Sequence, residues 1–186
     1  MAPLPVSWPA LSAAVQRGVS FKFLGFWKPS QPLGCLGQWW PSTFSVDGQR
    51  YTTAEQYMMA GKAAMMGDPQ TRARILAAHD PREVKALGRQ VQPWDEARWK
   101  SGRVPLVVAG NLAKFSQDLD LQRQLLDTGD HVLVEASPLD RLWGVGLAVS
   151  NPAHADPLRW RGQNLLGFAL MVVRARLGGA PVDELG

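Results

Sequence analysis

The amino-acid sequence predicts an α+β fold: a single compact, helix-rich domain with a small antiparallel β-sheet. Helical patterns outnumber strand patterns, and the strands do not alternate regularly with helices, which disfavours a doubly wound parallel sheet. An Asp-Gly dipeptide between two short strand-like segments predicts a hairpin, because both positions of such a turn need positive φ. The domain is expected to span residues 21–178, between a loose Pro- and Ala-rich N-terminal arm, 1–20, and a frayed C-terminal tail, 179–186.

The first half of the domain begins with strands and continues into a clearly marked helix. Alternating apolar residues predict a strand at 21–26, and the hairpin follows it. Thr53 is a predicted N-cap, and Gln56, three residues later, completes the sequence of a capping box. The helix is expected to cover 54–66 and to end at Gly67.

The second half is mainly helical. Asp80 is a predicted N-cap with Pro81 at the first helical position, and this helix is expected to end at Gly88. The other expected elements are a long helix at 94–115, bent or broken near Pro105, a helix at 118–128, a strand at 131–136 and a terminal helix at 162–177.

The composition fits a cytoplasmic globular protein and argues against several kinds of site. The single cysteine, Cys35, allows no intramolecular disulfide, and the sequence has neither a signal-peptide pattern nor a run of 18 apolar residues. Three scattered histidines and the lack of a glycine-rich phosphate loop predict neither a metal nor a nucleotide cofactor. The net charge of +4 suits phosphorylated ligands or nucleic acid, although an ordinary solvated surface is the plainer explanation.

The helix predicted at 54–66 carries an acid and an amine on one face. Glu55 and Lys62 are seven residues apart, which places them within about 20° of each other around the helix and about 10 Å apart along it. Met58 and Met59 lie between them on that side. The arrangement suits a site lined by a carboxylate and an ammonium group, and the plainer alternative is a pair of solvent-facing charges.

Tryptophans in predicted loops are candidates for binding a flat heterocycle. Trp39 and Trp40 precede the hairpin, and Trp143 lies in a glycine-rich loop. Aromatic side chains can stack on a base, because every base presents a π face. The alternative is that the tryptophans are core anchors, which is the better interpretation for Trp94 and Trp99 on a predicted helix.

A second group of polar residues follows the strand predicted at 131–136. Asp140 leads into the glycine-rich segment 143–146, where a ligand can come close to the backbone. A turn residue is the alternative interpretation of Asp140. Asn164 and Arg174 on the terminal helix are either a polar pair facing a cleft or a cap and an exposed charge.

Eight groups of residues, taken in chain order, carry a family resemblance. They are 36–40, 46–48, 53–62, 87–89, Asn111 with 114–115, 133–137, Asp140 with 143–146, and 164–174. Together they resemble the NADAR, or YbiA-like, family over residues 21–177. Gln38 and Met59 depart from residues that are common in the family, and the N-terminal arm has no match.

The resemblance implies a compact, mostly helical α+β domain that hydrolyses an N-glycosidic bond to ribose. For bacterial relatives, the implied substrates are phosphoribosylamino-pyrimidine intermediates of riboflavin synthesis, which yield ribose 5-phosphate. For other relatives, the implied reaction is removal of ADP-ribose from guanine in nucleic acid. A catalytically silent module that binds ADP-ribose or another nucleotide is the third alternative. The expected partner is therefore a small phosphoribosylated molecule or ADP-ribosylated nucleic acid, and not a membrane.

The resemblance also implies roles for single residues. Glu55 matches the family's catalytic glutamate, whose carboxylate would stabilise positive charge at the anomeric carbon. Asp140 or a water is expected to protonate the leaving amine, and Lys62 either holds a phosphate or forms a Schiff base with an opened sugar. The expected substrate contacts are stacking by Trp39, Trp40 and Trp143, phosphate binding by Arg89 and Arg174, and further contacts by Gln38, Tyr57, Gly144 and Asn164.

Overall fold

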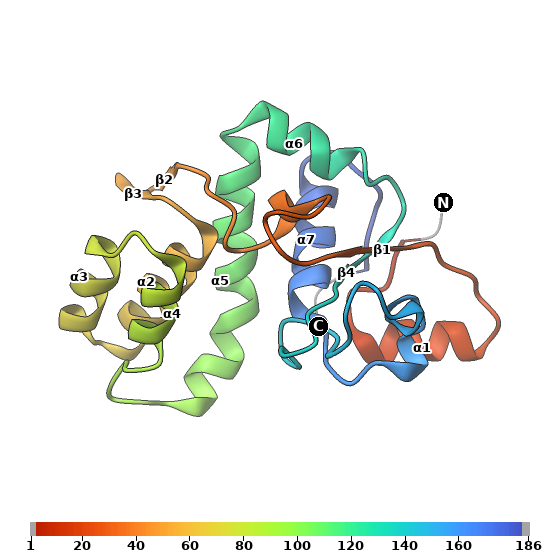
Figure 1. The fold of residues 1–186 in the computed structure, drawn as a ribbon, viewed down its shortest axis with the longest axis horizontal. Helices are drawn as coiled ribbons and strands as arrows, with labels where there is room; N and C mark the ends of the chain where they lie inside the picture. The colour runs from red at the N-terminus through yellow and green to blue at the C-terminus, as the bar shows by residue number, and fades with distance from the viewer. Residues whose placement is uncertain (1–2, 184–186) are drawn as a thin grey trace. The chain divides into compact units, whose positions relative to one another are not determined.

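The computed structural model describes residues 3–183, and its elements are labelled in Figure 1. Helices dominate and the strands are short, so the predicted helix-rich α+β class is confirmed. The chain contacts divide into two units, 38–118 and the pair of segments 1–37 and 119–186. Each unit is described by itself below.

The hairpin of the 38–118 unit forms where the sequence predicts it. Strands β2 (Phe44–Val46) and β3 (Gln49–Tyr51) pair antiparallel, with Phe44 opposite Tyr51. The turn residues Asp47 and Gly48 have φ values of 50° and 78°. Positive φ at both positions is what an Asp-Gly turn between twisted strands requires.

Helix α2 (Ala54–Met66) has the predicted bounds and caps. The Thr53 hydroxyl accepts the Gln56 N–H at 3.1 Å, and Gly67 ends the helix in the left-handed region with φ 76°. The second half of the capping box is shifted by one residue, because Gln56 Oε1 accepts the N–H of Thr52 at 2.9 Å. The Gln56 amide nitrogen lies near three carbonyls at the end of the next helix, those of Ile75, Leu76 and Ala78.

Helix α2 packs against the three other helices of its unit, α3 (Pro69–Ala77), α4 (Pro81–Gly88) and α5 (Glu96–Ser116). Helix α4 is confirmed with its Asp80 cap, whereas α3 was not predicted, although Asp68 caps it before a proline. Helix α5 is assigned as one helix through Pro105, where the sequence suggested a bend or break. Glycines allow α2 and α5 to approach closely, since a Cβ on Gly110 would overlap the ring of Tyr57.

The other unit is built on a pair of parallel strands. Strand β1 (Phe23–Phe26) pairs with β4 (Val132–Glu135), with Phe23 opposite Val132, and helix α7 (Leu165–Arg176) packs against β4. Both strands were predicted, but their parallel pairing was not. The unit also contains helix α6 (Leu119–Leu126) and the short 3₁₀ segments η1 (Gly34–Leu36), η2 (Pro152–Ala155) and η3 (Pro157–Arg159). Although α7 is apolar, no helix within residues 3–183 is long and apolar enough to cross a membrane.

The N-terminal segment contains a helix that was not predicted, α1 (Trp8–Gln16). Leu11 is fully buried, and the Trp8 indole N–H donates to the Pro157 carbonyl at 2.8 Å. Leu4 forms a parallel bridge with Val182, so part of the predicted arm and part of the predicted tail lie side by side. These contacts replace the expected loose arm with packed structure, while residues 184–186 of the expected tail lie outside the described range.

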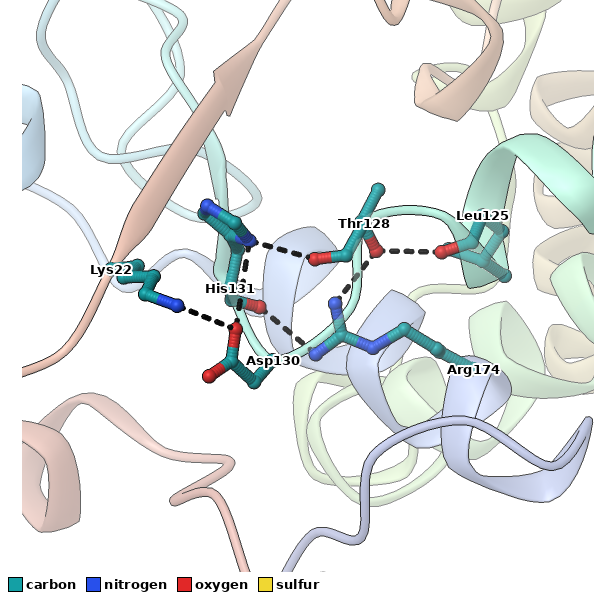
Figure 2. A network of polar contacts seen from close by, with 6 residues as sticks. All are labelled: Lys22, Leu125, Thr128, Asp130, His131 and Arg174. Carbon is teal, nitrogen blue, oxygen red and sulfur yellow. Dashed lines mark hydrogen bonds and ion pairs between the residues drawn. The ribbon is translucent and has the colours of Figure 1, made fainter.

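A buried arginine joins α7 to the turn that follows α6 (Figure 2). Arg174 is fully buried, and its guanidinium donates to the Thr128 hydroxyl at 2.7 Å and to the His131 carbonyl at 2.9 Å. The Thr128 hydroxyl in turn donates to the Leu125 carbonyl. Burial lowers the pKa of Arg174 to about 10, opposed by the nearby Asp130, so the side chain remains a cation at neutral pH.

Arg174→Met is therefore expected to destabilise the protein by about 2–4 kcal/mol, because it leaves a buried hydroxyl and a buried carbonyl without their charged donor. Urea unfolding followed by circular dichroism measures this loss. Arg176→Met, on an exposed position of the same helix, is the matched control and is expected to change the free energy of unfolding by less than about 0.5 kcal/mol. Equal effects of the two variants would contradict a structural role for the Arg174 contacts.

Candidate functional site

Helix α2 presents the predicted acid and amine on one face of the 38–118 unit. Glu55 lies in the first turn and is only 3% exposed, whereas Lys62, two turns later, is half-buried. Met58 is buried between them. The plainer alternative of two solvent-facing charges is therefore wrong. The N-terminal end of a helix favours negative charge, which suits a carboxylate at the position of Glu55.

Aromatic rings and a carbonyl hold the ammonium group of Lys62. Its Nζ donates to the Gly88 carbonyl at 2.7 Å and lies 4.7 Å from the ring centroid of Trp94 and 5.5 Å from that of Trp99. Cation–π contacts at these distances stabilise a charged amine that has lost part of its water. Trp99 is buried, whereas Trp94 is 41% exposed and forms the outer wall of this amine site.

The environment of Lys62 shifts its proton equilibrium. Burial lowers the pKa of Lys62 below its ordinary value, the negative charge of Glu55 opposes this, Arg89 adds to the lowering, and Glu96 opposes it. A lowered pKa increases the neutral fraction of the amine, which is the nucleophilic form. Glu55 shares a helix face with Lys62, and Arg89 follows Gly88, whose carbonyl accepts the Lys62 hydrogen bond, so the positions agree with these charge effects. Arg89 is exposed at the end of α4, where it remains available to an anionic ligand.

Gln38 contacts α2 beside Glu55. The Gln38 backbone carbonyl accepts the Glu55 N–H at 2.9 Å, and the Gln38 amide nitrogen lies 4.0 Å from the sulfur of Met58. The side-chain oxygen of Gln38 accepts from the amide nitrogen of Asn111 at 3.0 Å. Asn111 is fully buried on α5 and also donates to the Val107 carbonyl at 2.9 Å. Gln38, which the sequence proposed as a substrate contact, is thus held on the same face as the acid.

The aromatic candidates of this unit separate into two groups. Trp39 and Trp40 are half-buried, so both indoles keep exposed surface. The ammonium of Lys85 lies over the Trp39 ring, 5.8 Å from its centroid. Tyr57 instead packs in a cluster with Phe44 and Tyr51 and against Gly110. Burial raises the pKa of Tyr57, with smaller contributions from Tyr51 and Asp47. The expected substrate contact by Tyr57 does not fit this position, because packing occupies its ring.

In the other unit, Asp140 shapes a turn. Its Oδ1 accepts the N–H groups of Leu142 at 2.9 Å and Trp143 at 2.7 Å, as a turn residue does. A Cβ on Gly144 would lie 2.8 Å from the Glu135 carbonyl, so this glycine is required by the loop's own backbone. The Trp143 indole is half-buried and keeps surface for stacking. Of the two interpretations of Asp140, the hydrogen bonds favour the turn residue.

Two other candidates in that unit have structural partners. Asn164 is fully buried, accepts the Glu135 N–H at 2.9 Å and donates to the Leu133 carbonyl at 2.8 Å, which ties the start of α7 to β4. Arg174 is fully buried in the contacts of Figure 2. The expected roles of Asn164 in substrate binding and of Arg174 in phosphate binding do not fit these positions, because the side chains serve backbone carbonyls and a hydroxyl.

The predicted residues thus fall into two sets, one in each unit. Gln38, Glu55, Lys62 and Arg89 come together around α2, while the loop from Asp140 to Gly144 forms the second set. Two features were not predicted from the sequence: the amine site made by Trp94 and Trp99, and the contact of Asn111 with Gln38. These contacts join residues far apart in the chain, so no local pattern predicts them. The only signal for Asn111 was its place among the residues that carry the family resemblance.

Two further kinds of site can be compared with the α2 face, a metal-ligand cluster and a surface hollow. No cluster of three or more His, Cys, Asp or Glu side chains suited to a metal ion occurs between residues 3 and 183. A surface hollow beside α7 is lined by Val172, Arg176 and Val182, among others, and contains none of the predicted site residues. The α2 face is therefore the best-supported chemical site of its unit.

Known proteins resemble the chain over most of its length. The model of the NADAR domain family matches residues 25–178. The chain is 38% identical over 157 residues to the N-glycosidase R617 of Acanthamoeba polyphaga mimivirus, covering 82% of this chain and 92% of that protein. It is 32% identical over 152 residues to the riboflavin biosynthesis protein VVA0006 of Vibrio vulnificus, covering 82% of this chain and 38% of that protein. The NMR structure of the E. coli protein YbiA matches with a TM-score of 0.70 at 27% identity, covering 86% of this chain and 87% of that one.

The charges around Lys62 lead to opposite expectations for two variants. Glu55→Gln removes a charge that raises the pKa of Lys62, so the pKa should fall further; Arg89→Gln removes a charge that lowers it, so the pKa should rise. NMR titration of the lysine side-chain resonances measures both changes. Arg82→Gln, at an exposed position of α4, is the control and should leave the Lys62 titration where it is. The same direction of change for Glu55→Gln and Arg89→Gln would show that these charges do not act on Lys62 as described.

Proposed function

The chain belongs to the NADAR domain family and is an N-glycosidase, and we propose that it hydrolyses the ribosyl C–N bond of phosphoribosylamino-pyrimidine intermediates of riboflavin synthesis. The products are ribose 5-phosphate and a free amino-heterocycle. The buried carboxylate of Glu55 on one face with the desolvated amine of Lys62 carries this proposal. The name of the Vibrio vulnificus relative supports the substrate class. The proposed catalytic domain spans residues 21–178, as the sequence predicts.

The proposed chemistry is a displacement at the anomeric carbon. As the C–N bond breaks, the nitrogen keeps the bonding electron pair and positive charge develops on the sugar, which the Glu55 carboxylate stabilises. The same carboxylate takes a proton from a water whose oxygen bonds to the anomeric carbon. The leaving nitrogen gains a proton, which we assign to water ahead of Asp140, because Asp140 Oδ1 already accepts two backbone N–H groups.

Lys62 fits two roles in this scheme. As a cation it binds the 5-phosphate together with the exposed Arg89, since Lys62 is hydrogen-bonded to Gly88, the residue before Arg89. As a neutral amine it attacks the carbon of an opened sugar, displaces the heterocycle and forms a Schiff base, which water then hydrolyses to the sugar aldehyde and the free amine. Its lowered pKa supports the second role, whereas its hydrogen bond to the Gly88 carbonyl and its cation–π contact with Trp94 favour the cation of the first role.

The remaining contacts are assigned by exposure. In the unit that carries Glu55, Trp39 and Trp40 keep half-buried indoles that are suited to stacking on the heterocycle. Trp143, in the other unit, remains a separate candidate for stacking. The alternative substrate, ADP-ribosylated guanine in nucleic acid, is supported by the net charge of +4. The two substrates are distinguished by the sugar product that each one releases.

Glu55→Gln is expected to lower turnover by about 100-fold or more, because it keeps the shape of the side chain and removes the charge that stabilises the transition state. The assay incubates the protein with a phosphoribosylamino-pyrimidine and, separately, with an ADP-ribosylated guanine oligonucleotide, and measures ribose 5-phosphate and ADP-ribose. Glu83→Gln, at an exposed position in the first turn of α4, is the matched control and should retain full activity. Thermal unfolding of both variants separates lost chemistry from lost fold.

The outcomes separate the candidate functions. Ribose 5-phosphate released by the native protein and lost in Glu55→Gln supports the metabolic function. ADP-ribose released from the oligonucleotide alone makes nucleic acid the substrate. No release from either would leave the silent binding module and reject both hydrolytic proposals.

Lys62→Arg distinguishes the two roles of the lysine. Arginine keeps the positive charge and cannot form a Schiff base, so a Schiff-base mechanism predicts a loss of about 1,000-fold or more in kcat. Borohydride reduction during turnover, followed by mass spectrometry, detects the native adduct on Lys62. Retained activity in Lys62→Arg with no trapped adduct would assign the residue to phosphate binding.

A further inference from the structure

The orientation of one buried amide in the 38–118 unit is fixed by its partners. Asn111 is fully buried, and its amide nitrogen is 2.9 Å from the Val107 carbonyl. Because a carbonyl oxygen only accepts, the amide nitrogen of Asn111 must face it; the reversed amide would place two acceptors in contact. Its second N–H is then directed to Gln38, at 3.0 Å.

The orientation of Asn111 determines that of Gln38. Gln38 must turn its Oε1 toward the Asn111 N–H, which leaves its own amide nitrogen on the opposite side. The neighbour of that nitrogen is the sulfur of Met58 at 4.0 Å, and a thioether is a weak acceptor. Gln38 therefore presents two N–H donors that its own unit satisfies poorly.

These donors lie on the face that carries the proposed catalytic groups. Glu55 and Met58 are one turn apart on α2, and Lys62 follows one turn after Met58, so all three share a face. The Gln38 backbone is bonded to Glu55, and its amide lies against Met58. An acceptor bound here would lie beside the carboxylate and against an apolar, polarizable sulfur, which suits a flat heterocycle.

The oxygen of Asn111 adds a second observation. Its Oδ1 is buried and has no hydrogen-bond partner among residues 3–183. Leaving a buried acceptor unpaired is costly, and such groups are rare in folded proteins outside functional sites. An apolar residue at this position would avoid that cost, so retention of an amide here fits a role in directing Gln38.

We propose that Asn111 positions Gln38 so that the Gln38 amide donates to a carbonyl oxygen or ring nitrogen of the heterocycle, making Gln38 a specificity-determining residue. The inference rests on the proposed N-glycosidase reaction at Glu55 and adds the class of group that the substrate must carry. A heterocycle with an acceptor near the scissile bond is favoured over one that presents a donor there.

Kinetics of Gln38→Glu test the proposal with a phosphoribosylamino-pyrimidinedione, whose ring carbonyls are acceptors. The carboxylate keeps the contact with Asn111 and replaces the outward donors by an acceptor. The KM is expected to rise by about 10- to 100-fold, while kcat changes by less than about threefold. Gln70→Glu, the same change at an exposed position of α3, should leave both constants unchanged.

A double-mutant cycle tests whether Asn111 acts through Gln38. Asn111→Leu is expected to raise KM by about 3- to 10-fold in the native background and to have no further effect on KM in Gln38→Leu. Fully additive effects would overturn the positioning role, and an unchanged KM in Gln38→Glu would overturn the donor role. Thermal unfolding of each variant identifies any that fail to fold.

Side-chain amide NMR provides a readout that does not depend on turnover. Both Nδ2 protons of Asn111 are expected to show hydrogen-bonded shifts, and the Gln38 Nε2 protons should show nuclear Overhauser contacts to the Met58 methyl group. The free pyrimidinedione should move the Gln38 amide resonances and ribose 5-phosphate should not. Equal responses to the two probes would show that Gln38 contacts the sugar and would overturn the proposal. If the native protein releases no ribose 5-phosphate, the proposed function fails, while these resonances still decide the orientation of Gln38.

Discussion

The position of the proposed catalytic carboxylate, Glu55, depends on the buried amide of the next residue, Gln56. Its Oε1 accepts the Thr52 N–H, and its nitrogen lies 2.8 Å from the Ala78 carbonyl and 3.2 Å from those of Ile75 and Leu76. One side chain thus fixes the chain entering α2 and the end of α3. Because Glu55 precedes Gln56 directly, this anchor holds the Glu55 backbone without using its carboxylate. A network of this kind rigidifies a site only when its polar members are satisfied.

Arg174 and Lys62 show how different degrees of burial leave one cation structural and suit the other to the proposed chemistry. Both are met mainly by neutral dipoles: Arg174 by a hydroxyl and a carbonyl, Lys62 by a carbonyl and two indoles. Full burial lowers the pKa of Arg174 only to about 10, so it remains charged and structural. Lysine differs because its amine deprotonates more readily and is nucleophilic once neutral. Partial burial beside an exposed tryptophan therefore gives Lys62 both the lowered pKa and the access that a reacting group needs.

Local sequence signals predicted the helices and strands well, but nothing in the sequence indicated the long-range contacts between them. Thr53, Gly67 and Asp80 define helix ends through bonds to residues within one turn, so short sequence patterns locate them. The pairing of β1 with β4 joins segments more than 100 residues apart, which no local pattern encodes. The same holds for the candidate site. Glu55 and Lys62 lie on one helix, so helical periodicity alone predicted that they share a face. The sequence could not foresee the backbone contacts of Asn164, because a buried polar residue that bonds to the backbone has the same sequence signature as one that binds a ligand.

The proposed roles of Gln38 and Lys62 predict different responses to pH for heterocycle binding and for turnover. The Gln38 amide does not ionise, so hydrogen bonding to a neutral heterocycle should stay constant across the working pH range. Lys62 changes charge when its amine loses a proton, so with Lys62 in its proposed role turnover should follow its protonation. With Lys62 in its proposed role, its lowered pKa is expected to place the alkaline change of kcat below the ordinary titration range of lysine. A pH profile in which heterocycle binding falls together with kcat would therefore mean that recognition depends on a charged group, and would move the specificity contact from Gln38 to Glu55 or Lys62.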